Sequence, residues 1–245
     1  MTVQPSVTAT PAVAVPVRRT RRFYVAMALA FVLTVFVGFS RSYFLKLHYG
    51  TPALSLLLHV HAVVFSSWVL LFVAQTTLVA AHRTDLHRRL GVAGAVLAGT
   101  LLVMGTTIAI LRVRGGSAPI PGVSGLAFLA IPLFDMVAFA ILVGAGLALR
   151  RRPETHKRLM TLATIALMTA PIARIPPVFR AGPPAFFGLT DLFIVVMLVY
   201  DFATRRRVHP ATTWGGLVLV ASQPLRLMIS GTAAWTAFAA WATGW

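Results

Sequence analysis

The sequence has no cysteine among its 245 residues and only five acidic residues. The absence of cysteine excludes disulfide bonds, thiolate metal sites, cysteine-ligated iron–sulfur clusters and covalent c-type haem attachment. Against the five acidic residues stand 22 Lys and Arg, so the formal net charge is +17. A charge of that size can indicate nucleic-acid binding, and the positions of the basic residues decide whether it does so here.

The chain also has little charge of either sign for its length. Charged residues make up 11% of it, hydrophobic residues 58%, and the mean hydropathy is +0.84. A soluble domain of this length is far less apolar, so the composition predicts an integral membrane protein. A helix needs about 20 mostly apolar residues to cross the hydrocarbon core.

Seven apolar stretches meet or nearly meet that length: residues 23–39, 53–80, 90–111, 125–149, 159–175, 186–203 and 214–235. Apolar residues run continuously through each stretch rather than alternating with polar ones, which favours helices over barrel strands. We therefore expect an all-α integral membrane fold, a seven-transmembrane-helix bundle. Residues 1–22, rich in Pro, Thr, Val and Ala, are expected to form a disordered cytoplasmic tail, and residues 23–245 a single membrane domain.

Most basic residues fall on one side of such a bundle. They cluster before the first stretch and between the second and third, fourth and fifth, and sixth and seventh: residues 18–22, 83–89, 150–158 and 205–207. Positive charge accumulates in cytoplasmic loops, which predicts a cytoplasmic N-terminus and an outside C-terminus. Trp241 and Trp245 fit the outer headgroup zone, and Trp214 the inner one. The expected partner is the lipid bilayer of the bacterial cytoplasmic (inner) membrane, and no nucleic acid.

A short sequence motif that contains histidine recurs on the basic side of the predicted bundle. Leu86-His87-Arg88-Arg89-Leu90 is echoed by Thr155-His156-Lys157-Arg158-Leu159, either through duplication of a helix pair or through independent gain of basic interfacial residues. His209 also precedes an apolar stretch, and His82 lies five residues before His87. The exposed amides at helix starts and the nearby arginines disfavour protonated histidine, and neutral histidine is the form that ligates metals.

These residues predict a cofactor site on the inner face. The candidate metal ligands are His82, His87, His156 and His209, and His87 with His156 is the strongest pair. Asp85, Glu154 and Asp201 are nearby carboxylates that could orient the ligands. The alternative is that each histidine is an ordinary interfacial anchor beside arginines.

A second polar layer is expected in the outer half of the bundle. Asp135 lies about ten positions into the fourth stretch, or roughly 15 Å deep. Side chains two residues apart in a helix point about 200° apart, so His59 and His61 cannot chelate one ion together. The layer comprises His59, His61, Asp135, Arg174, Asp191, Gln223 and Arg226. It forms either a water-accessible pocket or a set of ion pairs that fix helix packing.

The chain resembles uncharacterised bacterial seven-helix membrane proteins in Arg-Arg-Phe-Tyr-Val, His-Val-His-Ala-Val-Val-Phe, Leu-His-Arg-Arg-Leu-Gly and Thr-His-Lys-Arg-Leu-Met. That resemblance covers most of its length and implies no activity. The histidine words are also similar to those of membrane b-type cytochromes and haem A synthase, whose helix-end histidines bind haem. This similarity implies that His87 and His156 are axial ligands. The chain lacks the glutamate of haem A synthase before His87, and it supports at most one haem.

Three functions follow as hypotheses. The first is a protein that binds haem b or a divalent metal and works in electron transfer or respiratory-complex assembly, with a redox membrane complex as partner. The second is a small-molecule or ion transporter with a pocket around Asp135. The third is a zinc-dependent membrane hydrolase similar to the alkaline ceramidase and adiponectin-receptor superfamily, although the paired histidines of that family are missing from the last stretch.

Overall fold

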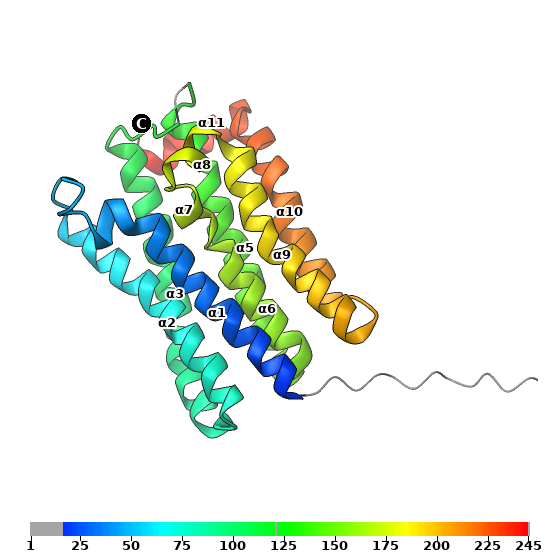
Figure 1. Ribbon diagram of the computed structural model, residues 1–245. Helices are drawn as coiled ribbons and strands as arrows, with labels where there is room; N and C mark the ends of the chain where they lie inside the picture. The colour runs from blue at the N-terminus through cyan, green and yellow to red at the C-terminus, as the bar shows by residue number, and fades with distance from the viewer. Residues whose placement is uncertain (1–16, 121, 245) are drawn as a thin grey trace, which may run out of the picture.

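The computed structural model describes residues 17–120 and 122–244, which form helices and connecting turns with no β-strand (Figure 1). The elements are α1 (Val17–Phe39), the π-helix η1 (Ser40–Phe44), α2 (Leu56–Ala80), α3 (Thr84–Arg114), α4 (Gly125–Phe128), α5 (Ala130–Ala148), α6 (Pro153–Ala166), α7 (Thr169–Ile172), α8 (Pro176–Arg180), α9 (Pro183–Arg205), α10 (Pro210–Ser230) and α11 (Ala233–Thr243). The all-α prediction is confirmed for these residues.

Five helical stretches are long and apolar enough to cross a membrane, and the bent pair of α10 and α11 would make a sixth. The five are Thr20–Phe44, Leu56–Ala80, Thr84–Arg114, Gly125–Ala148 and Pro183–Arg205. Each coincides with one of the predicted stretches. These helices support the predicted membrane character of the chain.

The stretch predicted at residues 159–175 is not one continuous helix. It is divided into α6 and α7 around Leu167 and Met168. Pro171 explains the break, since a proline ring clashes with the carbonyl four residues earlier, here that of Leu167, and offers no amide hydrogen. Ile175, directly before Pro176, is extended (φ −73°, ψ 117°), as a residue preceding proline prefers.

The stretch predicted at residues 214–235 ends early. α10 stops at Ser230, and Thr232 caps a separate helix, α11, which is turned by 87° from α10. The Thr232 hydroxyl accepts a hydrogen bond from the Trp235 amide at 3.2 Å, a common way to start a helix. The predicted boundary at Trp235 is wrong because a capping threonine after Gly231 starts a new helix.

α1 already begins at Val17, so residues 17–22, which the sequence assigned to a disordered tail, are helical. Residues 1–16 and Trp245, to which the sequence assigned a disordered tail and an interfacial position, lie outside the described residues.

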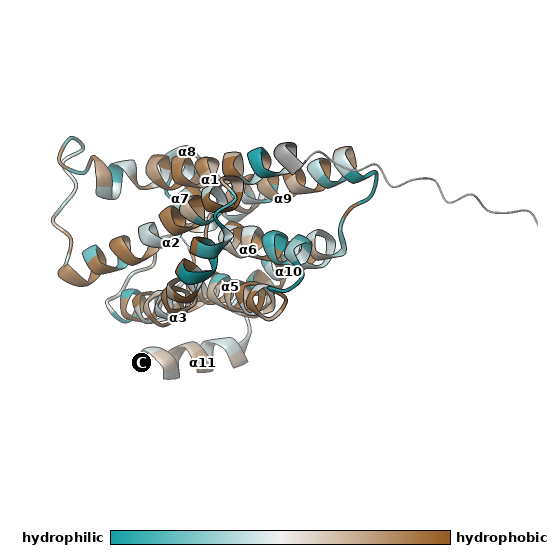
Figure 2. Ribbon diagram, turned by 90° about the horizontal axis from the view of Figure 1, so that it is seen from below, coloured by the Kyte–Doolittle hydropathy of each residue, from teal (hydrophilic) through white to brown (hydrophobic). Residues whose placement is uncertain are grey.

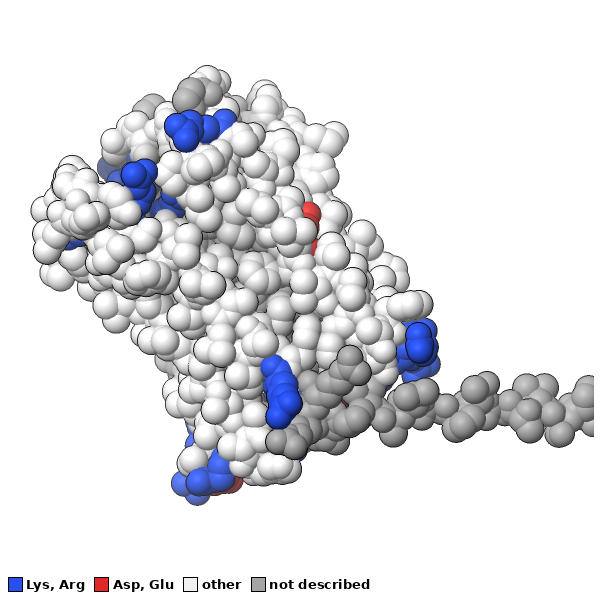
Figure 3. Space-filling model, viewed as in Figure 1, with Lys and Arg blue, Asp and Glu red and all other residues white. Residues whose placement is uncertain are grey.

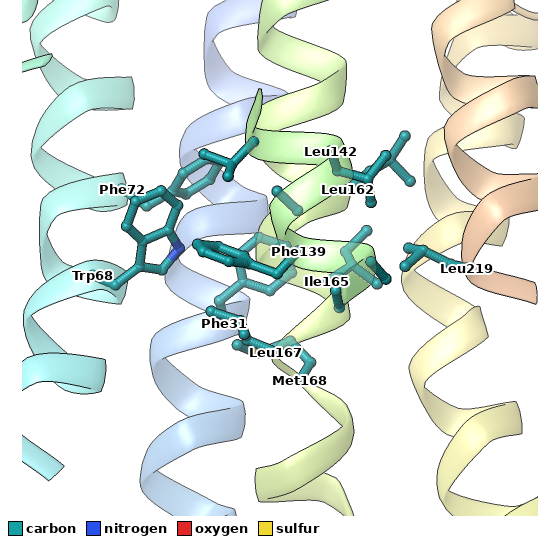
Figure 4. Packing of buried hydrophobic residues seen from close by; sticks show 14 of the residues in the cluster. Phe31, Trp68, Phe72, Phe139, Leu142, Leu162, Ile165, Leu167, Met168 and Leu219 are labelled. Atoms are coloured by element: carbon teal, nitrogen blue, oxygen red, sulfur yellow. The ribbon is translucent and has the colours of Figure 1, made fainter. Parts of the chain in front are cut away.

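α6 lies at the centre of the bundle, where α1, α5, α9 and α10 surround it. Residues Thr161 to Ala166 of α6 are all buried. Figure 4 shows the adjoining core, in which Trp68, Phe139 and Phe31 meet the leucines and isoleucine of α5 and α6. The Trp68 indole donates a hydrogen bond to the Thr164 hydroxyl at 3.2 Å, which satisfies a polar group that lipid could not satisfy.

Basic side chains gather toward the two ends of the molecule, and the broad belt between them is uncharged apart from one small acidic patch (Figure 3). Large apolar side chains are exposed on that belt, among them Leu33, Val63, Val96 and Val199. A surface of this kind suits lipid rather than water.

The closest helix approach in the bundle gives a test of this packing. A methyl group at Gly38 in α1 would lie 2.1 Å from the Pro171 carbonyl oxygen, a backbone atom that cannot turn away. We expect Gly38→Ala to lower the unfolding free energy by about 1–3 kcal/mol, the usual cost of overpacking. Thermal unfolding in detergent measures this. Gly99→Ala is the matched control because nothing lies within 4 Å of its added methyl, and equal stability of the two variants would contradict the packing described.

Candidate functional site

His87 and His156 lie close together at the basic end of the bundle. Each is the fourth residue of its helix, α3 and α6 respectively. Their ring centres are 6.3 Å apart, and the ring planes are inclined at 81°. The two residues are far apart in sequence, so the fold brings together the pair that the repeated histidine word singled out.

Each ring is held through its Nδ1 atom. Nδ1 of His156 lies 2.8 Å from the Gly146 carbonyl oxygen at the end of α5. A carbonyl can only accept, so the proton of neutral His156 is on Nδ1 and Nε2 keeps a free lone pair. A hydrogen bond from a ring N–H to a backbone carbonyl is the usual support of a histidine that binds a metal.

The partner of His87 is Gln75, from α2. In the orientation that satisfies its surroundings, the Gln75 amide nitrogen donates to His87 Nδ1 at 2.6 Å and to the His87 carbonyl at 3.2 Å, and its oxygen accepts from the Gly91 amide at 3.1 Å. The proton of neutral His87 is then on Nε2. The two Nε2 atoms are therefore complementary, one a donor and the other an acceptor. No sequence motif marked Gln75, because it lies in an apolar stretch one helix before His87.

The other two predicted ligands lie elsewhere. His82 is in the α2–α3 turn with a positive φ of 62°, and its ring contacts the Arg21 guanidinium. His209 precedes α10, and its Nδ1 accepts a hydrogen bond from the Ala211 amide at 3.1 Å. Within residues 17–120 and 122–244, no three His, Cys, Asp or Glu side chains are grouped so that they could hold a metal ion. The four predicted ligands are therefore not grouped in this structure, and of them only His87 and His156 lie together.

A buried ion pair that the sequence did not reveal lies beside this site. Arg158 on α6 donates hydrogen bonds to Asp201 on α9 through Nε, at 3.1 Å to each oxygen, and through a terminal nitrogen. Both side chains are 1% exposed. Asp201 also accepts from the Thr212 hydroxyl at 2.6 Å and the His209 amide at 3.2 Å. The sequence singled out Asp201 only as a carboxylate that could orient the histidines, because nothing local relates Asp201 to Arg158.

Glu154, at the start of α6, extends the network to the surface. It accepts from Lys157 at 2.5 Å, from Arg158 at 2.8 Å and from Arg205 at 2.6 Å. Burial acts to raise the pKa of its carboxyl, but the hydrogen bonds and charges of Lys157 and Arg158 prevail and lower this pKa to about 2. Burial, together with the charges of Arg158 and Arg205, lowers the pKa of the His209 ring, which favours its neutral form.

The outer polar layer does not form one pocket. Its deepest member, Asp135, pairs with Arg226 at 2.5 Å. The Arg226 guanidinium also donates to the Ile131 carbonyl at 3.2 Å and to the Ser222 hydroxyl at 2.7 Å, and it lies over the Phe134 and Phe187 rings. Both charges are thus paired and hydrogen-bonded, as intramembrane charges must be.

The remaining members of that layer are separate from this pair. Gln223 donates to Asp191 at 2.7 Å, Arg174 donates to the Ala170 carbonyl at 2.9 Å, and His59 lies 3.4 Å from the Tyr43 hydroxyl. His61 packs on Phe65, and its Nδ1 atom is buried without a hydrogen bond. Two hollows of about 270 and 460 Å³ have mostly apolar linings, and no member of the layer lines either of them.

Comparison with protein-family models, with curated proteins and with solved structures gives no match to this chain. What sequence and structure define is a class of protein: an all-α chain whose helices could span a membrane, with a histidine pair and a buried charge network at one end.

The buried pair gives a stability prediction. Asp201→Ala leaves the buried Arg158 guanidinium with only Glu154, a half-exposed carboxylate, as its partner, and breaking a buried ion pair typically costs about 3–5 kcal/mol. We expect a correspondingly large fall in the denaturation midpoint in detergent. Asp85→Ala is the matched control, because the Asp85–Arg83 pair is more than half exposed on both sides (58% and 56%) and such pairs contribute about 0–1 kcal/mol. A loss for Asp201→Ala no larger than for Asp85→Ala would refute the role given to the pair.

The Glu154 carboxyl gives a pH prediction. Its folded pKa of about 2 lies below its ordinary value of 4.5, so its stabilising effect is complete above pH 4.5 and is lost as the pH falls toward 2. Acid titration followed by circular dichroism should show less acid destabilisation in Glu154→Gln than in the parent. Parallel titration curves would show that this carboxyl contributes nothing to acid sensitivity.

Proposed function

We propose that this chain is a multi-pass protein of the bacterial cytoplasmic membrane with seven crossing segments. The fifth is formed by α7 together with α6 from Leu159 onward. The basic clusters support a cytoplasmic N-terminus and an outside C-terminus. They place His87 and His156 at the cytoplasmic surface.

We further propose that this pair binds one haem b, or failing that one divalent metal ion, for electron transfer or respiratory-complex assembly. The observation that carries the proposal is the 6.3 Å between the ring centres. A metal–nitrogen bond is about 2.1 Å long, so two imidazoles whose ring centres are 6.3 Å apart are close enough that both could reach one ion.

The donor set fits such an ion with one adjustment. His156 already offers Nε2, because its Nδ1 proton is engaged by Gly146. His87 offers Nε2 only when Nδ1 carries the proton, and the Gln75 amide must then be reversed so that its oxygen accepts from Nδ1–H. The reversed amide loses its hydrogen bonds with the His87 carbonyl and the Gly91 amide, which is a cost of binding an ion here. The arginines beside both histidines in sequence would pair with haem propionates. A haem iron held by two histidines supplies one-electron exchange, and the chain's residues orient the ligands and anchor the propionates.

The direct test is absorbance in the Soret region, with iron and divalent-metal analysis of the same sample purified from haem-replete cells. We expect about one haem or one ion per chain. His87→Ala and His156→Ala should each abolish binding of the haem or ion. His59→Ala, at the other end of the bundle, should retain this binding. A colourless, metal-free parent protein refutes the proposal.

Gln75 provides a finer test of the same site. Glutamate at this position can only accept a hydrogen bond at neutral pH, so Gln75→Glu should favour the His87 tautomer that presents Nε2. We expect Gln75→Glu to keep or tighten cofactor binding and Gln75→Leu to weaken it by about 10–100-fold. Titration of the apoprotein with haem measures both variants. The reverse order would show that Gln75 does not orient a ligand.

Transport through the outer polar layer is a second candidate, supported by the buried Asp135–Arg226 pair, since intramembrane charges often line substrate or ion paths. Uptake assays in proteoliposomes of the parent and of Asp135→Asn test it, and no flux in either would exclude it. A zinc hydrolase would need a third ligand, and within the part of the chain that the structure describes only two histidines come together.

A further inference from the structure

α11 lies across the end of the bundle rather than along it. It is turned by 87° from α10, and in Figure 2 it is seen from the side whereas α3, α5 and α10 are seen nearly end on. α10 has 21 residues, which at 1.5 Å each is about 32 Å and matches the thickness of the hydrocarbon core. If α10 crosses the hydrocarbon core on its own, as the proposed seven-segment topology requires, α11 begins at the depth where the hydrocarbon ends.

One face of α11 is fastened to the bundle. Trp235, Ala239 and Thr243, which follow at four-residue intervals, are buried. The Trp235 indole donates to the Leu126 carbonyl at 2.8 Å, and Trp235 and Ala239 pack with Ala109 and Val113 of α3. These contacts fix the rotation of α11 about its own axis and so determine which side chains point away.

Two other large aromatic side chains of α11 are exposed: Phe238, whose ring centre lies 5.4 Å from that of Trp235, and Trp241, which points away from the buried face. Phe238 is 44% and Trp241 78% exposed, and their ring centres are 6.0 Å apart. The eleven residues of α11 include no charged side chain. Eleven residues cover about 16 Å, too short to cross a bilayer, and tryptophan is the residue that prefers the headgroup level.

We propose that α11 is an interfacial helix, with Phe238 and Trp241 inserted among the lipids at the boundary between headgroups and acyl chains. The two sides of the helix then have different surroundings: Trp235 lies in protein, and Trp241 lies in lipid about 5–10 Å below the surface. The inference rests on the membrane position of α10 and is independent of any cofactor.

The experiment uses the full chain in phosphatidylcholine vesicles and compares two variants with a single tryptophan each. One retains Trp241 and the other Trp235, with the other four tryptophans replaced by phenylalanine. Lipids brominated near the headgroup end of the acyl chain should quench most Trp241 emission, and lipids brominated near the methyl end much less. Trp235 is the matched control on the same helix and should lose little with either lipid.

Three results would overturn the proposal: no quenching of Trp241 by either lipid together with quenching by aqueous iodide, stronger quenching of Trp241 by the deep bromines, or protection of Trp241 that disappears when the protein is diluted in lipid. The first places α11 in water, the second in the membrane interior and the third against a second copy of the chain.

A second measurement avoids multiple tryptophan replacements. The chain has no cysteine, so Ala237→Cys, on the exposed face of α11, can carry a single nitroxide. Its accessibility to oxygen and to a water-soluble nickel complex reports depth. We expect a shallower position than for Leu70→Cys, which is near the middle of α2 and 60% exposed, and an equal or greater depth contradicts the proposal.

Discussion

The ion pair between Arg158 and Asp201 is the constraint on which the basic end of this protein depends. It joins the central helix α6 to α9, and through Thr212 and the His209 amide it joins both to the start of α10. Two desolvated charges are tolerable only with good geometry and further hydrogen bonds, and here both are present. Because His156 is two residues before Arg158, the same contacts that hold α6 also position the histidine.

The spacing and orientation of the His87 and His156 rings also depend on hydrogen bonds from neighbouring helices. α5 offers the Gly146 carbonyl to His156, and α2 offers the Gln75 amide to His87. Four helices thus contribute to the spacing of two imidazole rings. At the other end, the Asp135–Arg226 pair ties α5 to α10 in a comparable way, so charge pairs fasten the bundle at two levels while its outer surface remains apolar.

Much of the fold could be predicted from sequence because apolar length and basic clusters are local properties. His87 and His156 could be chosen as a pair because their surrounding words match. The break at Pro171 and the bend after Ser230 were missed, since average hydropathy does not register single residues that end a helix. The partnership of Arg158 with Asp201 could not be seen, because helix order in the bundle determines it. The outer layer was predicted from depth alone, and depth says nothing about the direction in which His61, Asp135 or Asp191 points.

The central claim is that His87 and His156 share one iron. The electron paramagnetic resonance spectrum of the oxidised protein, purified from haem-replete cells, tests it most directly. A low-spin haem signal typical of two imidazole ligands, replaced by a high-spin signal or lost in both His87→Ala and His156→Ala, is the predicted result. A parent spectrum without haem, or a low-spin signal that survives either substitution, would contradict it.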